Sequence, residues 1–330
     1  METDILILGA GMAGLACARH LTAAGHTPLV IDKGRGVGGR MATRRISISG
    51  RNLSFDHGAQ YFTARNPAFS ALTQAAGDSV TRWEDGAGET RFVGCPGMTS
   101  LPRMMAEGLH VRPQVEVKSL HQDGSRWVLE TTDGTVRTRR LVMTIPAPQA
   151  VRLLGADHPA SARLETVEMA PCLTLMAAFP PEEPKPFISR ASQAHPLAWI
   201  AQDSSKPGRT ASASTWIAQA GPEWSLQHLE EAPESIAPLM LALLAEEIGA
   251  DLQAAIHAAA HRWRYARVIK ALGQPFLRSD DGTLWLGGDW CLGPRVEAAW
   301  ESGDAIGRDV LSCQLWREGT KTPPISPRPQ

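Results

Sequence analysis

The segment DILILGAGMAGLACARHLTAAGHTPLVID, residues 4–32, indicates how the chain begins to fold. Residues 4–8 predict a buried strand, residues 12–24 a helix that ends at Gly25, and residues 28–31 a second short strand. A strand, a glycine-rich turn, a helix and a strand within about 30 residues are the usual opening of a parallel sheet covered by helices. The sequence therefore predicts an α/β fold.

The turn between strand and helix contains glycines at positions 9, 11 and 14. Gly9 permits the tight turn, Gly11 lets a diphosphate approach backbone N–H groups at the helix N-terminus, and Gly14 lets the helix pack closely on the sheet. Asp32, at the end of the second strand, is placed to accept hydrogen bonds from an adenosine ribose. This spacing predicts a Rossmann-like dinucleotide site but does not separate NAD from FAD.

Composition and charge exclude several classes of function. The 330 residues carry a net charge of -1, so neither nucleic-acid nor anionic-membrane binding has electrostatic support. No apolar run approaches the roughly 18 residues that span a membrane. Glu2 and Asp4 argue against a signal peptide, and five scattered cysteines without metal-ligand spacing favour a reducing compartment. We therefore expect a cytoplasmic protein without a metal site.

The rest of the chain predicts a second unit inserted into the first. The further elements expected from apolar periodicity and turn residues are hairpins over 111–142, a strand over 141–145, strands at the two WIAQ segments (199–202 and 216–219), a helix over 236–248, a strand over 283–286 and a helix over 295–310. Pro and Trp become frequent after about residue 156. We predict a Rossmann-like domain with a parallel sheet, helices and a β-meander, into which an α+β substrate domain with a mixed or antiparallel sheet is inserted. The predicted bounds are 1–60, 94–155 and 268–317 for the first domain, 61–93 and 156–267 for the second, and 318–330 for a disordered tail.

Three later motifs carry a resemblance to a known clan. Gly38-Gly39-Arg40 follows the second strand, DHGAQYF occupies residues 56–62, and Gly288-Asp289 precedes the last helix. With the N-terminal turn they resemble the amine-oxidase-like branch of the glutathione-reductase-type flavoproteins. The resemblance implies FAD, and it implies that the last helix points its positive end at the flavin and stabilises the reduced anion. The cofactor-binding residues that it implies are Gly9, Ala10, Gly11, Met12, Ala13, Gly14, Asp32, Lys33, Gly39, Arg40, Met41, His57, Gly58, Ala59, Val115, Gly288, Asp289 and Val296.

A closer resemblance is to the bacterial renalase family. It is carried by GRGVGGRM (34–41), DHGAQYFTAR (56–65), GCPGMTSL (94–101), TIPAPQA (144–150), SKPGR (205–209), HRWRYAR (261–267) and GGDWCLGPRVEAAWESG (287–303). The resemblance implies an FAD oxidase that converts the 2- and 6-dihydro isomers of NAD(P) to NAD(P)+ and reduces O2 to hydrogen peroxide. The sequence departs from the family at His57, where an apolar residue is expected, at Cys95, where an acidic residue is common, and in the extra tail.

The chemistry implied by this resemblance makes modest demands on side chains. Loss of hydride from a dihydronicotinamide restores aromaticity and needs no general base, only a flat slot that excludes water. We therefore expect no single indispensable catalytic residue. The residues expected to line the substrate pocket are Gln60, Tyr61, Phe62, Pro96, Gly97, Met98, Trp199, Trp216, Tyr265, Trp290 and Arg295.

Alternatives stay open for the function and for several of these residues. An amine oxidase or desaturase of the same clan is one, although amine oxidases usually carry a tyrosine pair and a lysine near the flavin, and none of the six lysines here lies in a predicted pocket strand. A flavin-binding module without turnover is another. Trp199, Trp216 and Met98 could be core residues, His261 could be structural, and Arg295 could pair with Glu297 or Glu301. Cys291 follows the late Gly-Asp pair, so we expect non-covalent FAD.

Overall fold

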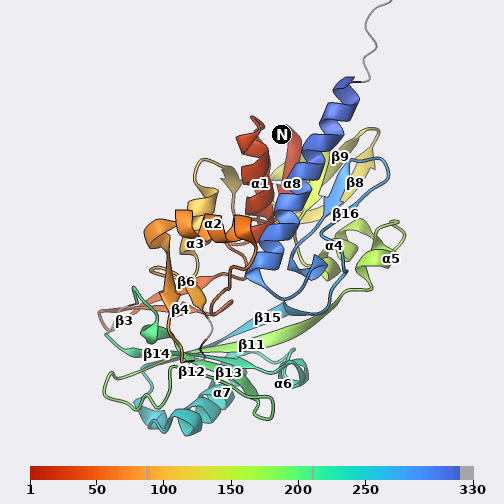
Figure 1. The fold of residues 1–330 in the computed structure, drawn as a ribbon. Helices are drawn as coiled ribbons and strands as arrows, with labels where there is room; N and C mark the ends of the chain where they lie inside the picture. Colours follow the sequence, from red (N-terminus) through yellow and green to blue (C-terminus); the bar gives the residue numbers. More distant parts are fainter. Residues whose placement is uncertain (87, 89, 210–211, 320–330) are drawn as a thin grey trace, which may run out of the picture.

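The computed structural model describes residues 1–86, 88, 90–209 and 212–319. An eight-stranded sheet occupies the upper part of Figure 1, and a five-stranded antiparallel sheet occupies the lower part. Two long strands of the lower sheet, β11 (Glu168–Phe179) and β15 (His257–Lys270), run along the boundary between the two parts (Figure 1).

The upper sheet is mostly parallel. Its parallel strands are, in spatial order, β17 (Leu284–Leu286), β10 (Gly134–Met143), β1 (Glu2–Leu8), β2 (Leu29–Ile31) and β7 (His110–Arg112). The antiparallel additions are β16 (Leu277–Arg278) at one edge and the meander β8 (Val117–Asp123) and β9 (Arg126–Thr131), which pairs with β10. This arrangement is the predicted Rossmann-like domain with its β-meander.

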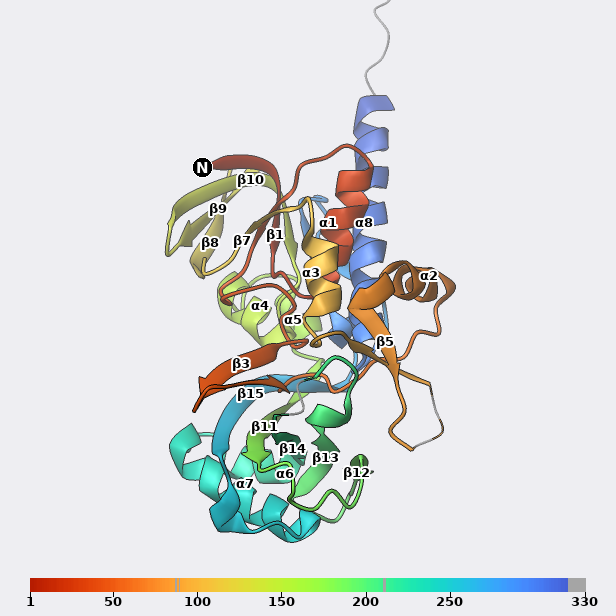
Figure 2. The same cartoon turned by 90° about the vertical axis from the view of Figure 1, so that its left-hand side faces the viewer.

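Successive side chains of β1 point to opposite faces of the upper sheet, and each face packs on different elements. Ile5 and Ile7 share a core with α1 (Met12–Ala23) and α8 (Val296–Gly319), which lie side by side (Figures 1 and 2). Leu6 and Leu8 point to the opposite face, toward the meander, α4 (Ala147–Leu154) and α5 (Ser161–Leu164). α1 and α8 can pack this closely because residue 303 is glycine. A Cβ at this position would lie 2.0 Å from the carbonyl oxygen of Ala13.

The lower sheet has the order β12 (Ser189–Ala191), β13 (Leu197–Gln202), β14 (Ser214–Ala220), β11 and β15. One face packs on α6 (Pro222–Gln227) and α7 (Pro233–Ile248). A hairpin of β3 (Thr43–Ile48) and β4 (Arg51–Asp56) crosses the other face (Figure 2), where Phe55 packs against Met176 and Ile217. A third core joins α2 (Pro67–Ala75), β5 (Val80–Trp83), β6 (Arg91–Gly94) and α3 (Ser100–Ala106) to α1.

The predicted fold class is confirmed: a Rossmann-like unit is joined to a unit with an antiparallel sheet. Three element predictions need correction. Of the hairpins expected over 111–142, the first residues instead belong to β7, which pairs in parallel with β2. The strand expected over 141–145 is the end of the ten-residue β10, and the last helix continues past residue 310 to Gly319. The predicted tail of residues 318–330 lies mostly outside the described residues, and the domain bounds stay a prediction. No helix within the described ranges has the length and apolarity to cross a membrane.

Candidate functional site

The glycine turn after β1 is held by Asp32, at the end of β2. Its Oδ2 accepts a hydrogen bond from the N–H of Ala10 (2.7 Å), and its Oδ1 accepts one from the N–H of Gly34 (2.6 Å). Gly9 has a φ of +110°, which a residue with a side chain rarely adopts. Because each carboxylate oxygen has a second lone pair, Asp32 can still accept a hydrogen bond from a ribose hydroxyl.

Space for a diphosphate lies at the N-terminus of α1. A Cβ on Gly11 would meet no atom within 4 Å, whereas a Cβ on Gly14 would lie 1.9 Å from the carbonyl oxygen of Gly9. Gly39 lies beside Gly11, since a Cβ on Gly39 would be 3.5 Å from the Cα of Gly11. An open cradle of backbone at the positive end of a twelve-residue helix is a site that binds phosphate groups. The residues present therefore fit the diphosphate of a dinucleotide.

An ion pair joins two of the motifs from the sequence. Arg40 donates two hydrogen bonds to Asp289, from Nη1 to Oδ2 (2.8 Å) and from Nη2 to Oδ1 (2.6 Å), and a third to the carbonyl of Ala266 on β15 (3.1 Å). The carbonyl of Arg40 accepts from the N–H of Ala59 (2.8 Å), and a Cβ on Gly58 would lie 1.9 Å from that oxygen. The second glycine pair, the late Gly-Asp pair and the DHGAQYF segment therefore meet around Arg40.

The remaining predicted cofactor residues lie near this cradle. Met12, Met41 and Val296 share one apolar cluster. Val115 donates its N–H to the carbonyl of Asp32 (2.9 Å). Lys33, which follows Asp32 in the sequence, is exposed. Gly288 donates its N–H to Oγ of Ser302 (2.9 Å), directly before Asp289. The turns after β1, β2 and β17 thus converge at the carboxyl ends of parallel strands, where open α/β sheets bind their ligands.

The loop of residues 56–62, which follows β4, is fixed by side chains of the lower sheet. Gln219 of β14 donates its Nε2–H to the carbonyl of Gly58 (2.7 Å), and Trp263 of β15 donates its Nε1–H to the carbonyl of His57 (2.8 Å). Neither Gln219 nor Trp263 is among the site residues predicted from the sequence. Their separations from the loop, 161 and 206 positions, leave no local pattern that would have indicated the contact.

An aromatic pair flanks the 56–62 loop and holds an arginine. The rings of Tyr61 and Trp199 lie 5.7 Å apart, and the guanidinium carbon of Arg91 lies 4.1 Å and 5.2 Å from their centroids. Asp85 pairs with Arg91, and the two side chains are almost fully buried. The structure therefore brings together two predicted pocket residues, whose contact with a substrate stays a prediction, and adds a cation that the sequence did not indicate.

A buried cluster of charges lies beneath the same loop. Lys206 donates to Oδ1 of Asp203 (2.6 Å), Oε1 of Gln60 (3.2 Å) and Oδ2 of Asp56 (3.4 Å), and Arg209 also pairs with Asp56. Burial raises the pKa of Asp203. Burial acts in the same direction on Asp56, but Lys206 and Arg209 outweigh it and lower the pKa of Asp56. The cluster joins the DHGAQYF and SKPGR segments, which is the signal by which Lys206 could have been found.

Two neutral histidines and a tryptophan pack on the other side of the loop. The His57 ring lies 4.8 Å from His261 edge-on and 5.4 Å from Trp263 in a stacked arrangement. Burial, followed by the charge of His261, lowers the pKa of His57 to about 4. Burial, followed by the charge of Arg44, lowers the pKa of His261 to about 4. Both imidazoles are therefore uncharged at neutral pH.

Buried polar atoms without a partner are concentrated at this loop. Within the described part of the chain, the buried side-chain atoms without a hydrogen bond include Nδ1 of His57, Nε1 of Trp199 and the Nε atoms of Arg91 and Arg209. His57 is part of the loop, Arg91 and Trp199 contact Tyr61, and Arg209 pairs with Asp56. Native proteins pair most of their buried polar atoms, and a function at the site is one explanation for an exception. The 56–62 loop and the strands facing it are therefore the candidate site at the ring end of the cofactor.

The prediction that Trp216 lines the pocket is wrong. In the antiparallel pair β13–β14, Trp199 lies opposite Gln219, and Gln202 lies opposite Trp216. Paired residues share a face and residues three apart do not, so the two tryptophans point to opposite sides of the sheet. Trp216 is 0% exposed, packs toward α7 and donates its Nε1–H to Ser214 (3.0 Å).

Three more pocket predictions are wrong because protein atoms enclose the side chains. Trp290 is 0% exposed and donates its Nε1–H to the carbonyl of Ile145 (3.0 Å). Met98 is also fully buried, with its sulfur accepting from the N–H of Gly94. Phe62 packs between Phe92 and Phe69 in the same core.

The other predicted pocket residues range from buried to exposed. Gln60 is buried, and its amide is used by Lys206 and by the carbonyls of Asp56 and Gly58. Pro96 is exposed beside Gly208, Gly97 packs on Thr43, and the half-buried Tyr265 contacts Arg152 through its hydroxyl (3.2 Å). Arg295 is exposed at the start of α8. It forms no ion pair with a described residue, because Glu297 instead accepts the N–H groups of Arg65 and Asn66 (both 2.6 Å).

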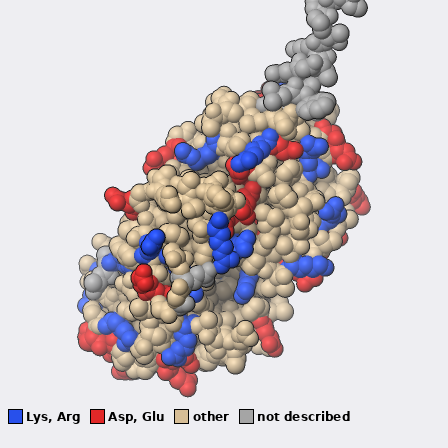
Figure 3. Space-filling view, viewed as in Figure 1, with Lys and Arg blue, Asp and Glu red and all other residues tan. Residues whose placement is uncertain are grey.

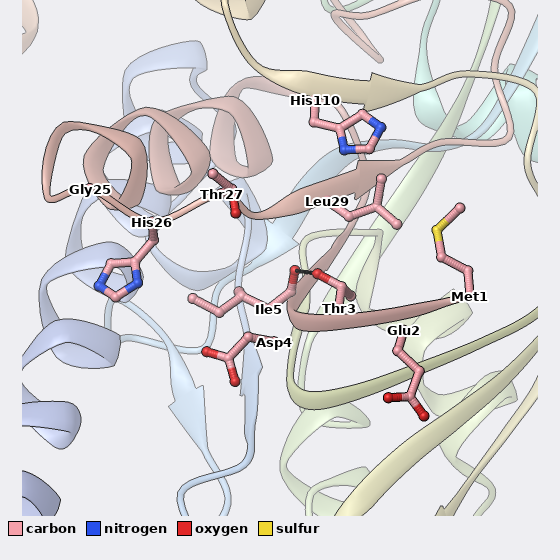
Figure 4. A pocket seen from close by; sticks show the side chains of 10 residues that line it. All are labelled: Met1, Glu2, Thr3, Asp4, Ile5, Gly25, His26, Thr27, Leu29 and His110. Carbon is pink, nitrogen blue, oxygen red and sulfur yellow. Dashed lines mark hydrogen bonds between the residues drawn. The ribbon is translucent and has the colours of Figure 1, made fainter.

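A cavity of about 420 Å³ lies at the opposite end of the upper sheet (Figure 4). The residues that line it are Met1–Ile5, Gly25–Thr27, Leu29 and His110. These positions are at the amino ends of β1, β2 and β7, whereas ligands of such sheets bind at the carboxyl ends. Basic and acidic side chains alternate over the face in Figure 3, in keeping with the net charge of -1. Neither feature competes with the candidate site.

Two protein families match the chain. Residues 7–76 match the NAD(P)-binding Rossmann-like domain, and residues 80–311 match flavin-containing amine oxidoreductases. A segment of 78 residues is 37% identical to a protein of Mycobacterium tuberculosis assigned as a flavin-containing monoamine oxidase, covering 24% of this chain and 16% of that protein. A segment of 38 residues is 50% identical to 15-cis-phytoene desaturase of Synechococcus elongatus, covering 12% and 8%. The matched segments thus span under a fifth of either relative.

Solved structures show the same fold over nearly the whole chain. A protein from Exiguobacterium sp. 255-15 assigned as a protoporphyrinogen oxidase has a TM-score of 0.77 at 14% identity, with 95% of this chain and 99% of that chain covered. Putrescine oxidase bound to putrescine has a TM-score of 0.68 at 14% identity, with 94% and 99% covered. At this identity the likeness concerns the fold alone. The family match, together with the cradle at α1, establishes FAD as the cofactor.

Proposed function

The chain belongs to the flavin-containing amine oxidoreductase family, and we propose that it is an oxidase for the 2- and 6-dihydro isomers of NAD(P), as its resemblance to the renalase family implies. Bound FAD accepts a hydride from the substrate and is reoxidised by O2 to give hydrogen peroxide. The residues of the chain then have three tasks: to hold the cofactor, to orient a flat ring against it and to exclude water.

One observation favours dihydronicotinamides over amines as substrates: the aromatic pair of Tyr61 and Trp199 already contacts a cation, Arg91. Arg91 lies over the rings of Tyr61 and Trp199, where a protonated amine would otherwise stack. The Arg91 guanidinium, paired with Asp85, already occupies the ring faces that a protonated amine would use, whereas a neutral dihydronicotinamide does not depend on that contact. Tyr61 and Trp199 are each only half-buried, and we propose that their remaining ring surface contacts the planar substrate.

The bonding of the buried lysine near the 56–62 loop agrees with this proposal. An amine must lose a proton before it is oxidised, whereas a dihydronicotinamide need not. Lys206, the buried lysine nearest the loop, is already bound by Asp203, Asp56 and Gln60. Hydride loss instead requires positioning, for which the 56–62 loop is held by Gln219 and Trp263.

The cofactor end of the proposed enzyme uses the backbone and three charged side chains. Backbone N–H groups at the start of α1 hold the diphosphate, and Asp32 accepts from the ribose. The Arg40–Asp289 pair joins the turn after β2 to the turn after β17, and these two turns would hold the cofactor. We propose that FAD is bound non-covalently, since Cys291 is 0% exposed in the core between the upper sheet and the meander.

Anaerobic flavin reduction tests this function. The oxidised enzyme is mixed in separate reactions with 6-dihydroNAD, with ordinary NADH and with a panel of amines that includes putrescine. We expect 6-dihydroNAD to bleach the flavin within seconds and air to restore the colour with peroxide release. Bleaching by an amine alone would instead favour an amine oxidase, in line with the solved relative bound to putrescine. Bleaching without reoxidation by air or dyes would indicate a flavin-binding module without turnover.

A further inference from the structure

Lys206 is fully buried beneath the 56–62 loop, together with three other charged side chains. The side chains of Lys206, Asp56 and Asp203 are 0% exposed, and that of Arg209 is 1% exposed. Removing ionised groups from water costs free energy that their pairing often does not recover, and apolar residues of similar volume frequently stabilise a protein as well or better. Stability alone therefore does not account for a lysine at this position.

Lys206 holds the side-chain amide of Gln60 in one orientation. Its Nζ donates to Oε1 of Gln60 (3.2 Å), and because a lysine can only donate, the amide must turn its oxygen toward it. The amide nitrogen then faces the loop, where Nε2 donates to the carbonyl of Gly58 (3.1 Å) and to that of Asp56. The backbone of the loop is thus fixed through Gln60, and the orientation of Gln60 depends on Lys206.

The same cluster anchors the start of the loop. Oδ1 of Asp203 accepts from Lys206 (2.6 Å), while Oδ2 of Asp203 accepts the backbone N–H of Asp56 (3.2 Å). The carboxylate of Asp56 accepts from Lys206 (3.4 Å) and from the N–H of Met98 (2.9 Å). Lys206 therefore contacts every side chain that fixes the loop from below.

The loop passes this support on to the turns that would hold FAD. The N–H of Ala59 donates to the carbonyl of Arg40 (2.8 Å), and Arg40 pairs with Asp289. Gly39, directly before Arg40, lies beside Gly11 in the diphosphate cradle. Groups held in place beside a flavin affect its oxidised and reduced forms unequally, because the two forms differ in charge and hydrogen bonding. A change in how the loop is held should therefore alter the flavin.

We propose that Lys206 is a positioning residue for the flavin: it orients the Gln60 amide, which holds the 56–62 loop in place at the ring end of the FAD site. Lys206 acts through Gln60 and touches no cofactor itself, since its side chain is enclosed by protein atoms. The inference rests on FAD as the cofactor and not on the identity of the substrate.

Charge-balanced substitutions separate positioning from stability. Lys206→Met/Asp203→Asn removes one cation and one anion and keeps an oxygen at position 203, whereas Gln60→Met removes the amide and leaves the ion pairs. Gln202→Met is the control, because the amide of Gln202 donates to Ser204 (3.4 Å). The triple variant Lys206→Met/Asp203→Asn/Gln60→Met completes a double-mutant cycle. For each holoprotein, equilibration with reference dyes measures the midpoint potential of the flavin, and denaturant titration measures stability.

We expect Lys206→Met/Asp203→Asn and Gln60→Met each to lower the midpoint potential by about 30 mV, a tenfold loss of preference for the reduced flavin in a two-electron couple. The potential should fall because fixed donors stabilise the added negative charge of the reduced ring. The triple variant should shift no further, since both changes break one link, and Gln202→Met should keep the wild-type potential.

An unchanged potential in Gln60→Met would overturn the proposal, as would shifts that add up in the triple variant. A loss of stability at the wild-type potential would leave Lys206 with a structural role alone and would refute positioning. If Lys206→Met/Asp203→Asn does not fold, Gln60→Met decides alone, by a lowered or an unchanged potential. None of these measurements needs a substrate, so the result stands even if 6-dihydroNAD fails to reduce the enzyme.

Discussion

The two ends of the proposed cofactor site are built from different chemical groups. The nucleotide end consists of backbone N–H groups, glycines and one carboxylate, all within residues 9–39. The ring end consists of side chains from distant segments: Asp56 meets Lys206 across 150 positions, and His57 meets Trp263 across 206. A site made of backbone constrains residue types locally, whereas a site made of side chains depends on tertiary packing. We therefore expect single glycine substitutions to disrupt the nucleotide end, and the loss of a side-chain partner to disrupt the ring end.

The largest expected effect is at the nucleotide end, in Gly14→Ala. The added Cβ would lie 1.9 Å from a backbone oxygen that cannot move without opening the turn. We expect the free energy of unfolding to fall by about 4 kcal/mol or more, or the protein not to fold. Chemical denaturation measures the change. Gly36→Ala, where a Cβ meets no atom within 4 Å, should be close to the wild type, and a similar loss in both variants would refute the argument.

The next effect is at the ring end, in Lys206→Met. This change leaves Asp56 and Asp203 buried with less compensation, which typically costs about 3–5 kcal/mol of unfolding free energy. Lys118→Met removes an exposed pair with Glu116 and should cost below about 1 kcal/mol. If the two variants lose equal stability by denaturant titration, the Lys206 cluster does not stabilise the 56–62 loop as described.

Gly11→Ala should affect binding and spare the fold. The Cβ points into open space, so stability is expected to stay near that of the wild type, but the methyl group occupies the cradle for the diphosphate. We expect about a tenfold weaker affinity for FAD, measured by reconstitution of the apoprotein. Unchanged affinity would place the diphosphate elsewhere.

Lowering the pH should reduce the free energy of unfolding, because His57 and His261 at the ring end are buried in their neutral form. His57 and His261 have a pKa of about 4 in the folded protein against 6.5 for the free side chain. Between these values the unfolded chain binds protons that the folded chain does not, so stability is complete above pH 6.5 and falls as the pH is lowered toward about 4. The double variant His57→Leu/His261→Leu should show a shallower decline over this range. His121→Gln, at an exposed position, should keep the wild-type slope; a parallel decline in all three proteins would exclude the histidines as the cause.

The smallest effect is expected for Arg295→Met at the exposed start of α8. An exposed charge that assists substrate binding contributes below about 1 kcal/mol, so KM should rise by no more than about fivefold while kcat is unchanged. Steady-state kinetics with 6-dihydroNAD measures this ratio. A loss of kcat would instead mean that Arg295 acts in the chemical step.

Local sequence was informative wherever the backbone itself sets the requirement. Gly9, Gly14 and Asp32 could be assigned because a positive φ, a close helix approach and a strand-end carboxylate each restrict the residue type. The WIAQ segments are predicted as strands from their apolar pattern and from the turn residues between them, and both are strands. Their tryptophans could not be told apart, because Trp199 and Trp216 differ only in the face that antiparallel pairing gives them.

The ring end could be predicted only in part. Tyr61 and Trp199 were selected as aromatic residues near matching motifs, and they do meet. Arg91, Lys206 and Gln219 were missed because their roles come from partners on other strands. Trp290 and Met98 were chosen by proximity in sequence, yet their side chains point into the core.

The visible absorption spectrum of the purified protein tests most directly whether both ends serve one FAD. We expect a yellow protein with one FAD per chain, and complete release of the flavin into the filtrate after denaturation. A protein that stays colourless when FAD is added would contradict the site as described, and flavin that remains attached to the denatured chain would contradict non-covalent binding.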